Sequence, residues 1–364
     1  MGQIRITTEQ SSYPVIIGEN IYQELADFLG SAGITNKSKL MIITDSNVAP
    51  LYLKKIVDTL TGFTVVSYVV EAGEQAKSLE HFAKIISFAI TEGLDRSSVV
   101  LALGGGVVGD LAGFVAAVYM RGIAFVQLPT TILAHDSSVG GKVAINHPLG
   151  KNLVGAFYPP KLVVYDTSFL ATLPIREVRG GLAELVKHAL IADKKFADWL
   201  SANAEELLNL NLLRLSEALF QGIKVKAAIV QKDEKEQGVR AFLNYGHTFA
   251  HVVEIISNYS YSHGEAVAIG MAFASRLAYR LGMIDKSVDQ YTRTLLERFN
   301  LPTAISGDYG IAEMLNIMMR DKKFIHDRIR MVLPTAIGQV IIQEGLEKKN
   351  IAEVLEEIKN TDRI

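Results

Sequence analysis

A glycine-rich turn between a strand and a helix constrains the fold of this 364-residue chain more than any other feature. Residues 97–103, SSVVLAL, form a continuous apolar run of the kind found in buried parallel strands, and they lead directly into GGGVVGD at 104–110. An apolar helical pattern, DLAGFVAAVYM, begins where this turn ends. The order of strand, glycine turn and helix is typical of α/β sheets that bind nucleotides, because the turn lets a phosphate approach the helix N-terminus.

The segments around this turn repeat the alternation of strands and helices. Apolar strand patterns occur at 39–45, 63–70, 124–131 and 161–166, and helical patterns separate the earlier ones. We therefore expect a mostly parallel sheet with helices on both faces, preceded by a hairpin-like strand pair within 4–18.

The pattern changes after Pro174, because amphipathic helical segments then dominate to about residue 330. The segment RIRMVLPTAIGQVII at 328–342 is an exception and predicts two short strands or one extended segment. We predict an α/β protein with two domains. Residues 1–170 are expected to form a Rossmann-like nucleotide-binding domain, and residues 171–364 a mainly α-helical domain for metal and substrate.

The composition excludes several classes of function. Lys and Arg number 37 and Asp and Glu number 39, so a net charge of -2 provides no general basic surface for nucleic acid or an anionic membrane. The chain has no cysteine, which excludes disulfides and thiolate metal sites. Its start has no apolar signal core, and its longest apolar runs are too short to span a bilayer. We expect a cytoplasmic enzyme without nucleic-acid or membrane partners.

The glycine turn carries a dinucleotide-binding pattern. Gly104, Gly106 and Gly109 satisfy GxGxxG, although the same glycines could form a tight turn that serves packing alone. Asp45 ends the strand 39–45, where a ribose-binding acid is expected, but it could equally cap the next helix.

Two further polar segments have an open interpretation. Glu74 and Lys77 lie at a loop-to-helix entry, where paired charges are more often solvated than functional. Residues 129–152 are glycine-rich with little strand or helix periodicity, as in a surface loop. This segment joins the two halves of the chain, however, and its polar residues suit a phosphate or carboxylate ligand: Asp136, Lys142, Asn146, Lys151 and Asn152.

Three of the eight histidines fall within 240–265. His247 and His251 are four residues apart and share one face of a helix, as metal sites and anion sites both require. With His263 and Glu184 they offer the imidazole and carboxylate ligands that zinc takes in a protein without cysteine. Taken singly, each histidine is more often a helix-surface residue or a hydrogen-bonded core residue.

Eight motifs, in order along the chain, resemble the 3-dehydroquinate synthase family: GGGVVGD, YMRGI, QLPTT, DSSVGGK, NHPLGKN, GLAELVKH, LNYGHTFAH and HGEAVAIGM. The resemblance covers nearly the whole chain. It implies an NAD- and zinc-dependent lyase of the shikimate pathway, with cobalt as an alternative metal, that acts as a cytoplasmic homodimer. The implied substrate, 3-deoxy-D-arabino-heptulosonate 7-phosphate, becomes 3-dehydroquinate through transient oxidation by NAD, phosphate elimination, reduction and aldol cyclisation.

The resemblance also implies roles for individual residues. Glu184, His247 and His263 become the zinc ligands, so His251 moves from the metal to the substrate phosphate. That phosphate is also contacted by Lys142, Asn152 and Asn244, and by Arg121 from the neighbouring subunit.

The remaining substrate contacts are implied for Arg240, which holds the carboxylate, and for Asp136, Lys187 and Lys226, which contact the hydroxyls. A further site lysine comes from the DKK motif, for which we favour Lys322 over Lys323. The implied NAD contacts are Asp45, Asn47, Glu74, Lys77, Gly105, Gly106, Asp110, Thr130, Thr131, Lys151, Asn152, Phe169, Thr172, Leu173 and Glu177. Two departures from the family pattern affect loop geometry: the segment from Thr131 to Asp136 is one residue shorter, and Ala250 replaces a glycine.

Two other enzyme classes share part of this pattern. Other sugar-phosphate cyclases, such as 2-deoxy-scyllo-inosose synthase, share much of the motif order, but Arg240 argues against substrates that lack a carboxylate. A metal-dependent polyol dehydrogenase would need the same nucleotide turn and three metal ligands. It would not need the cationic and amide side chains that suit an anionic ligand.

Overall fold

The computed structural model describes residues 1–9, 11–320 and 329–359. Lys322 and Lys323, one of which the resemblance assigns to the substrate, lie outside the described residues. By packing, the chain divides into two compact units. The first comprises Met1–Leu173 and Leu212–Lys235, and the second comprises Pro174–Asn211 and Glu236–Ile364.

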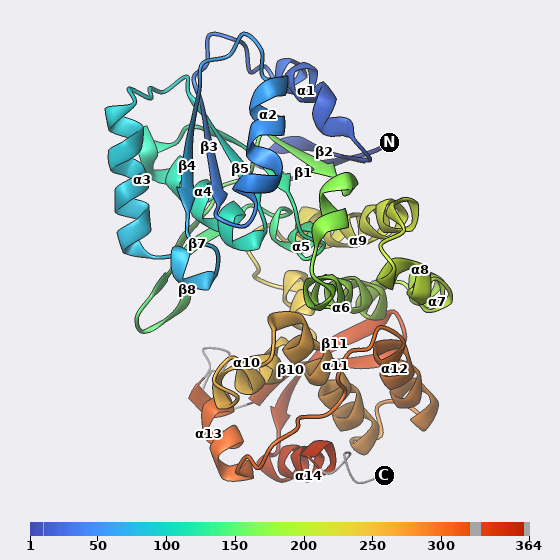
Figure 1. The fold of residues 1–364 in the computed structure, drawn as a ribbon. Coiled ribbons are helices and arrows are strands. Elements are labelled where there is room, and N and C mark those ends of the chain that lie inside the picture. The colour runs from blue at the N-terminus through green and yellow to red at the C-terminus, as the bar shows by residue number, and fades with distance from the viewer. Residues whose placement is uncertain (10, 321–328, 360–364) are drawn as a thin grey trace. The chain divides into compact units, whose positions relative to one another are not determined.

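A seven-stranded sheet forms the centre of the first unit (Figure 1). Its strands are β1 (Gly2–Thr7), β2 (Ser12–Gly18), β3 (Leu40–Asp45), β4 (Val65–Val70), β5 (Val99–Gly104), β6 (Ala124–Pro129) and β9 (Leu162–Asp166). They are arranged in the order β1-β2-β9-β6-β5-β3-β4, and all neighbours are parallel except β1 and β2. The predicted parallel sheet and the N-terminal strand pair are confirmed.

The helices of this unit are η1 (Ile21–Glu24), α1 (Leu25–Ser31), η2 (Ala49–Leu53), α2 (Lys54–Thr59), η3 (Glu74–Ala76), α3 (Leu79–Thr91), α4 (Gly106–Val118), η4 (Tyr119–Arg121), α5 (Ala134–Ser137), η5 (Thr167–Thr172) and α9 (Leu212–Lys232).

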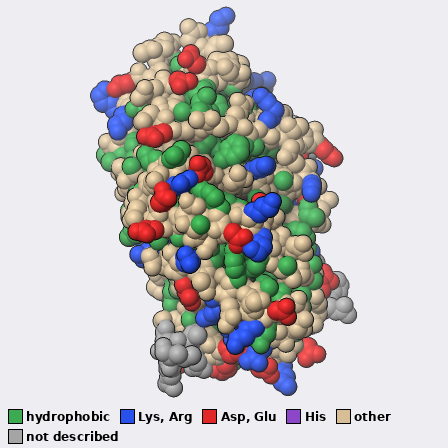
Figure 2. Space-filling model, turned by 90° about the vertical axis from the view of Figure 1, so that its right-hand side faces the viewer, with side chains coloured by type: hydrophobic (Ala, Val, Ile, Leu, Met, Phe, Trp, Pro, Cys, Tyr) green, Lys and Arg blue, Asp and Glu red, His purple; other side chains and the backbone are tan. Residues whose placement is uncertain are grey.

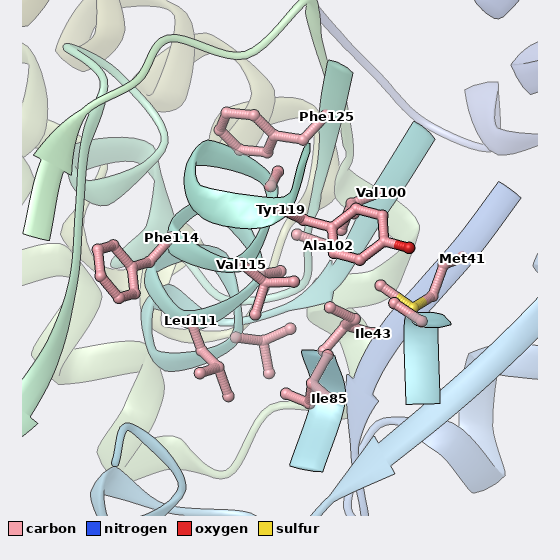
Figure 3. Close-up of a cluster of buried hydrophobic side chains, with 14 of the residues drawn as sticks. Met41, Ile43, Ile85, Val100, Ala102, Leu111, Phe114, Val115, Tyr119 and Phe125 are labelled. Carbon is pink, nitrogen blue, oxygen red and sulfur yellow. The ribbon is translucent and has the colours of Figure 1, made fainter. Parts of the chain in front are cut away.

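Side-chain alternation along the strands explains why both faces of the sheet carry helices. In β3, Met41 and Ile43 belong to the core on one face, and Leu40 and Ile42 to the core on the other. Figure 3 shows the first core, in which Met41 and Ile43 meet side chains of α3 and α4. The second core includes α1 and α2. Because both faces are buried, the strand is a continuous apolar run, which is the pattern that predicted it.

Residues 142–157 form an antiparallel ribbon of β7 (Lys142–His147) and β8 (Gly150–Phe157). Val143 and Ile145 are buried in the same core as α4. Gly113 of α4 makes room for this packing, because a Cβ there would lie 2.4 Å from Val143 Cγ1. The interpretation of this part as an irregular loop was therefore wrong. The glycine-rich composition is typical of a loop, and the side chains of α4 that cover Val143 and Ile145 belong to a different part of the sequence.

Helix α9 belongs to the first unit, although its sequence lies within the range 171–364 that we expected to form the second domain. It packs against β1, β2 and α5 and buries Leu215 and Leu219. The ring of Phe220 lies 2.9 Å from the position that a Cβ on Gly2 would occupy. An amphipathic pattern predicts that one helix face is buried, but it does not indicate which part of the chain covers that face.

The second unit is mainly helical, as expected, and consists of α6 (Ile175–Ala192), α7 (Lys194–Ala202), α8 (Ala204–Leu208), η6 (Val239–Asn244), α10 (His247–Ile256), α11 (His263–Arg280), α12 (Lys286–Arg298), α13 (Ile311–Arg320), β10 (Ile329–Ala336), β11 (Gln339–Leu346) and α14 (Lys348–Lys359). Helix α11 packs against α6, α10, α12, α14 and β10. Strands β10 and β11 pair antiparallel, which confirms the strands predicted within 328–342.

In the described part of the chain, no helix combines the length and the apolar character that crossing a membrane requires. On the face shown in Figure 2, basic and acidic side chains are interspersed.

Candidate active site

Three helices of the second unit each contribute one side chain to a cluster of metal-ligand type. Glu184 comes from α6, His247 from the start of α10 and His263 from the start of α11. Their ligand atoms lie within 4.8 Å of one another. Glu184 Oε1 lies 3.6 Å from His247 Nε2 and 3.3 Å from His263 Nε2. Packing of the three helices thus brings together residues that are far apart in the sequence.

The cluster fits a divalent metal ion. Ligands about 2.0–2.1 Å from a tetrahedral zinc ion lie roughly 3.3 Å apart, close to the two distances above. Nδ1 of His263 lies 3.0 Å from Glu254 Oε1, and Nδ1 of His247 lies 3.3 Å from the carbonyl oxygen of Tyr245. When each Nδ1 donates its proton to these acceptors, each Nε2 keeps its lone pair for a metal, as is usual for metal-binding histidines.

The charges around His263 favour a cation at this position. Burial alone would lower the pKa of His263, but hydrogen bonds to Glu184 and Glu254, together with their charges, raise the pKa to about 10. The Lys187 ammonium lies 2.5 Å from Glu184 Oε2, and both side chains are 1% exposed. With its pKa raised, His263 carries a proton on each ring nitrogen, and the proton on Nε2, which faces Glu184, is the one that a metal cation would replace.

A contact between two glycines brings α6 and α11 close together beside the cluster. Gly264 directly follows His263, and a Cβ on Gly264 would lie 2.3 Å from both the Cα and the carbonyl oxygen of Gly180. Gly180 lies one helical turn before Glu184 on α6. Since the obstructing atoms are backbone atoms, a side chain at Gly264 would force the two helices apart.

A second glycine pair acts in the same way between α10 and α11. A Cβ on Gly270 of α11 would lie 1.9 Å from the carbonyl oxygen of Gly246, the residue immediately before His247. Gly246 itself has a φ of +81°, which favours glycine. The positions of all three ligands therefore depend on helices that approach at backbone distance.

Replacing Gly264 by alanine is expected to destabilise the fold by about 1–3 kcal/mol through overpacking, and also to weaken zinc binding. Thermal denaturation of the metal-free protein and zinc titration against a chromophoric chelator measure the two effects. Gly310→Ala is the matched control, because the nearest atom to its Cβ would lie 3.9 Å away. If Gly264→Ala is destabilised but binds zinc as tightly as wild type, the contact between Gly264 and Gly180 does not determine the positions of the metal ligands.

A capping box fixes the start of α11 at His263. Ser262 Oγ accepts a hydrogen bond from the backbone N–H of Glu265, and Glu265 Oε2 accepts one from the backbone N–H of Ser262 at 2.7 Å. Arg176 of α6 holds the same carboxylate through Nε at 3.1 Å and Nη2 at 2.6 Å. The first residue of the helix is thereby held in place.

Two neighbouring residues that the resemblance assigns to the substrate, Arg240 and Asn244, lie in the same unit as the cluster. Arg240 and Asn244 belong to η6, and Arg240 is only 2% exposed. Asn244 Nδ2 donates to Oε1 of Glu236 at 2.9 Å. Sequence reasoning missed Glu236, because it lies in a charged run, QKDEKEQ, that resembles a solvated loop.

His251 lies one turn beyond His247 on α10, and the two ring centroids are 6.3 Å apart at 90°. Among the described residues, the group with ligand atoms close together contains His247 and His263 with Glu184 and omits His251. Helical spacing alone therefore did not identify the two histidines whose ligand atoms lie close to those of Glu184.

The first unit contains a cradle that suits the phosphates of a dinucleotide. The turn at Gly105 and Gly106 opens α4, and Cβ atoms there would lie 3.0 Å from Thr131 Cγ2 and 3.1 Å from Ser137 Oγ. The hydroxyls of Thr130 and Ser137 are buried and have no hydrogen-bond partner within the described chain. A helix N-terminus with nearby unpaired hydroxyls fits an anionic group.

Glu74 and Lys77, whose role the sequence left open, belong to a network of hydrogen bonds and ion pairs in this unit. Lys77 Nζ lies 2.7 Å from Asp110 Oδ2 and 2.6 Å from Asn152 Oδ1, and its side chain is 5% exposed. Glu74 accepts a hydrogen bond from Asn146 Nδ2 at 2.8 Å. Burial raises the pKa of Asp110, while the charge and hydrogen bond of Lys77 oppose that shift. The interpretation of Glu74 and Lys77 as isolated solvated charges was therefore wrong.

Asp45 and Asn47 lie at the carboxyl end of β3. Asp45 Oδ1 accepts hydrogen bonds from the backbone N–H of Asn47 at 2.9 Å and of Val48 at 3.0 Å. These bonds close a turn between β3 and η2. The N-cap of η2 is Val48 and receives no side-chain hydrogen bond, so the capping role that the sequence left open for Asp45 is not observed.

Phe169 and Thr172 line a cavity of about 190 Å³ in the first unit. The Phe169 ring lies 4.5 Å from that of Tyr52, whose hydroxyl is 2.6 Å from Thr172 Oγ1. The walls of this cavity offer flat aromatic surfaces. Leu173 ends the first segment of this unit, and Glu177 lies in the first turn of α6 in the second unit.

Asp136 and Lys226 form an ion pair at 2.9 Å in which Lys226 is buried. Lys142 begins β7, Lys151 lies on β8, and both are exposed. Arg121 follows Met120 in a turn where both residues have positive φ, 68° and 52°, and its side chain is exposed.

The chain is similar to known proteins along nearly its whole length. Family models for "3-dehydroquinate synthase N-terminal" and "3-dehydroquinate synthase C-terminal" match residues 67–180 and 181–324. The chain is 47% identical over 363 residues to the 3-dehydroquinate synthase of Geobacillus kaustophilus (strain HTA426), covering 97% of this chain and 96% of that protein.

Two solved structures are similar throughout. A 2-deoxy-scyllo-inosose synthase complexed with carbaglucose-6-phosphate, NAD+ and Co2+ matches with a TM-score of 0.90 and 26% identity over 98% of this chain and 100% of that chain. The 2-epi-5-epi-valiolone synthase of Streptomyces hygroscopicus subsp. jinggangensis 5008, with NAD+ and Zn2+ bound, matches with a TM-score of 0.87 and 27% identity over 97% and 98%.

Proposed function

The chain belongs to the 3-dehydroquinate synthase family, and on this premise we propose that it converts 3-deoxy-D-arabino-heptulosonate 7-phosphate into 3-dehydroquinate and inorganic phosphate. The observation that carries the proposal is identity of 47% over nearly the full length of a 3-dehydroquinate synthase. The inosose synthase, the alternative class, is more distant at 26%. The buried Arg240 also favours a substrate with a carboxylate.

We propose NAD and a divalent metal, zinc or cobalt, as the cofactors. The cradle at Gly105 and Gly106 would hold the dinucleotide phosphates, and Glu184, His247 and His263 would hold the metal. When bound, the dinucleotide supplies a reversible hydride acceptor and the metal a Lewis acid for the substrate hydroxyls. The two related cyclase structures that contain NAD+ with Co2+ or Zn2+ support this pairing.

The remaining polar residues bind and orient the substrate in this proposal. Arg240 pairs with the carboxylate through its planar guanidinium. The phosphate is contacted by Lys142, Asn152, Asn244 and His251, and the hydroxyls by Asp136, Lys187 and Lys226. Lys322 is a further lysine of the site. The ion pairs of Lys226 with Asp136 and of Lys187 with Glu184 keep these ammonium groups in place.

The chemistry of the substrate explains why the reaction continues after oxidation, and the residues that bind it assist each step. Oxidising the carbon-5 alcohol acidifies the proton on carbon 6, because a ketone then lies beside it. Loss of that proton expels phosphate, the hydride returns to carbon 5, and the ring opens and closes again by an aldol step. Cationic and amide groups stabilise the leaving phosphate and hold each intermediate in position.

We also propose a cytoplasmic homodimer, in which Arg121 of one subunit reaches the substrate phosphate of the other. The exposed position of Arg121 in its turn and the absence of cysteine support these two points.

Phosphate release distinguishes this function from that of a dehydrogenase. With substrate in excess, many phosphate ions should be released per NAD bound, while absorbance of NADH stays at or below the amount of enzyme, because each turnover returns the hydride. A substrate analogue without a leaving phosphate should stop after oxidation and leave reduced cofactor on the protein. Free NADH that accumulates in proportion to substrate, without phosphate, would identify a polyol dehydrogenase instead.

A further inference from the structure

We propose that Glu254 is a positioning residue for the metal centre, which sets the orientation and tautomer of His263 and adds negative charge next to the metal. This inference rests on the proposed metal site of Glu184, His247 and His263. Glu254 lies outside the ligand set, and none of the sequence motifs pointed to it.

The His263 ring lies between two carboxylates. Its Nε2 is 3.3 Å from Glu184 Oε1 and its Nδ1 is 3.0 Å from Glu254 Oε1. When a metal replaces the proton on Nε2, the imidazole keeps one proton, and the carboxylate of Glu254 at hydrogen-bond distance holds that proton on Nδ1. Glu254 therefore selects the tautomer in which Nε2 can bind a metal.

The position of Glu254 in the fold makes this contact rigid. It lies two turns after His247 on α10, so one helix carries both a metal ligand and the residue that orients another ligand. The Glu254 side chain is only 9% exposed. A buried carboxylate interacts more strongly with its neighbours than a solvated one, because water screens it less.

The two histidines are oriented by different groups. His247 Nδ1 lies 3.3 Å from a backbone carbonyl, that of Tyr245, whereas His263 Nδ1 faces the ionisable carboxylate of Glu254 at the shorter distance of 3.0 Å. Hydrogen bonds to an ionised acceptor are about twice as strong as those between neutral groups. A carboxylate also makes the imidazole more basic and hence a stronger ligand. The effect of Glu254 on the metal should therefore be measurable by mutation.

A purely structural role for Glu254, that of tying α10 to α11, must be separated from this one. Asp289 provides the matched comparison. It is 1% exposed, lies on α12 and ties that helix to α11 by accepting a hydrogen bond from Arg276 Nε at 2.9 Å. Both carboxylates therefore anchor α11, but only Glu254 contacts a residue of the metal cluster.

The test compares Glu254→Gln with Asp289→Asn in the metal-stripped full-length chain. Zinc affinity is measured by competition with a chromophoric chelator, the ligand field by the visible absorption of the Co2+ form, and stability by thermal denaturation without metal. Glu254→Gln should raise the zinc Kd about 10- to 100-fold and change the Co2+ spectrum. Asp289→Asn should lower the melting temperature and leave both metal readouts unchanged.

Equal zinc affinity and an unchanged Co2+ spectrum in Glu254→Gln would overturn the proposal. Should that variant fail to fold, Glu254→Asp keeps the charge but shortens the reach. It is expected to weaken zinc binding, and wild-type affinity in it would again overturn the proposal. Failure of the metal centre itself is distinguishable, because wild type would then bind no zinc, or would bind it no better than Glu184→Gln.

Discussion

Replacing Glu184 by glutamine is expected to lower kcat/KM about 10³-fold and to lower zinc content, because the change removes the only anionic member of the cluster. The loss corresponds to about 4 kcal/mol, within the several kcal/mol that a catalytic Lewis acid contributes. Glutamine also leaves the Lys187 ammonium, which is 1% exposed, without the carboxylate at 2.5 Å. Elemental analysis and steady-state phosphate release measure the two effects.

Removal of the metal from wild type should have the same consequence without any change of sequence. Chelation is expected to abolish turnover, and added zinc or cobalt is expected to restore it. The control for Glu184→Gln is Asp289→Asn, which removes another buried carboxylate of the same unit. Full activity of a preparation shown by elemental analysis to contain no metal would refute the metal hypothesis.

Replacing Arg240 by alanine is expected to cost about 2–5 kcal/mol of binding and orientation, or roughly 30- to 5000-fold in kcat/KM. Arg240 is 2% exposed, so the guanidinium acts where water screens charge weakly. Arg240→Lys keeps the charge but loses the planar fork, and an intermediate value is expected. Measurement of kcat/KM for phosphate release distinguishes the three proteins.

The control for this variant is Arg276→Ala, which removes the arginine that donates to Asp289 at 2.9 Å and to Glu357 at 2.8 Å. It should lower the melting temperature with little effect on kcat/KM. A near-wild-type value for Arg240→Ala would assign the substrate carboxylate to another residue and would reopen the inosose synthase alternative.

The strands were predictable because their signal is local. In β3 and β5, every residue from 40 to 44 and from 99 to 104 is buried, and such runs occur in few other contexts. The ribbon of β7 and β8 was not predictable in the same way. Its exposed positions and glycines are typical of a loop, and the packing of Val143 against α4 is visible only in the tertiary structure.

The sequence predicted the chemical type of the metal ligands, but not which histidines lie next to each other in the fold. The absence of cysteine and the histidines within 240–265 indicated a nitrogen and oxygen ligand set. Helical spacing favoured His247 with His251, because periodicity describes one helix at a time. The choice of His263 depends on how α11 crosses α10, and no periodicity records that crossing.

The sequence by itself determined the strands of the central sheet and the local turn chemistry, from the glycine turn at 104–110 to the turn at Asp45, since these depend on residues a few positions apart. Only the tertiary structure decided that α9 returns to the first unit, that Gly264 lies against Gly180, and that Glu254 faces His263. Each of these contacts joins separate elements. Burial and backbone approach select such contacts only after the whole unit has packed.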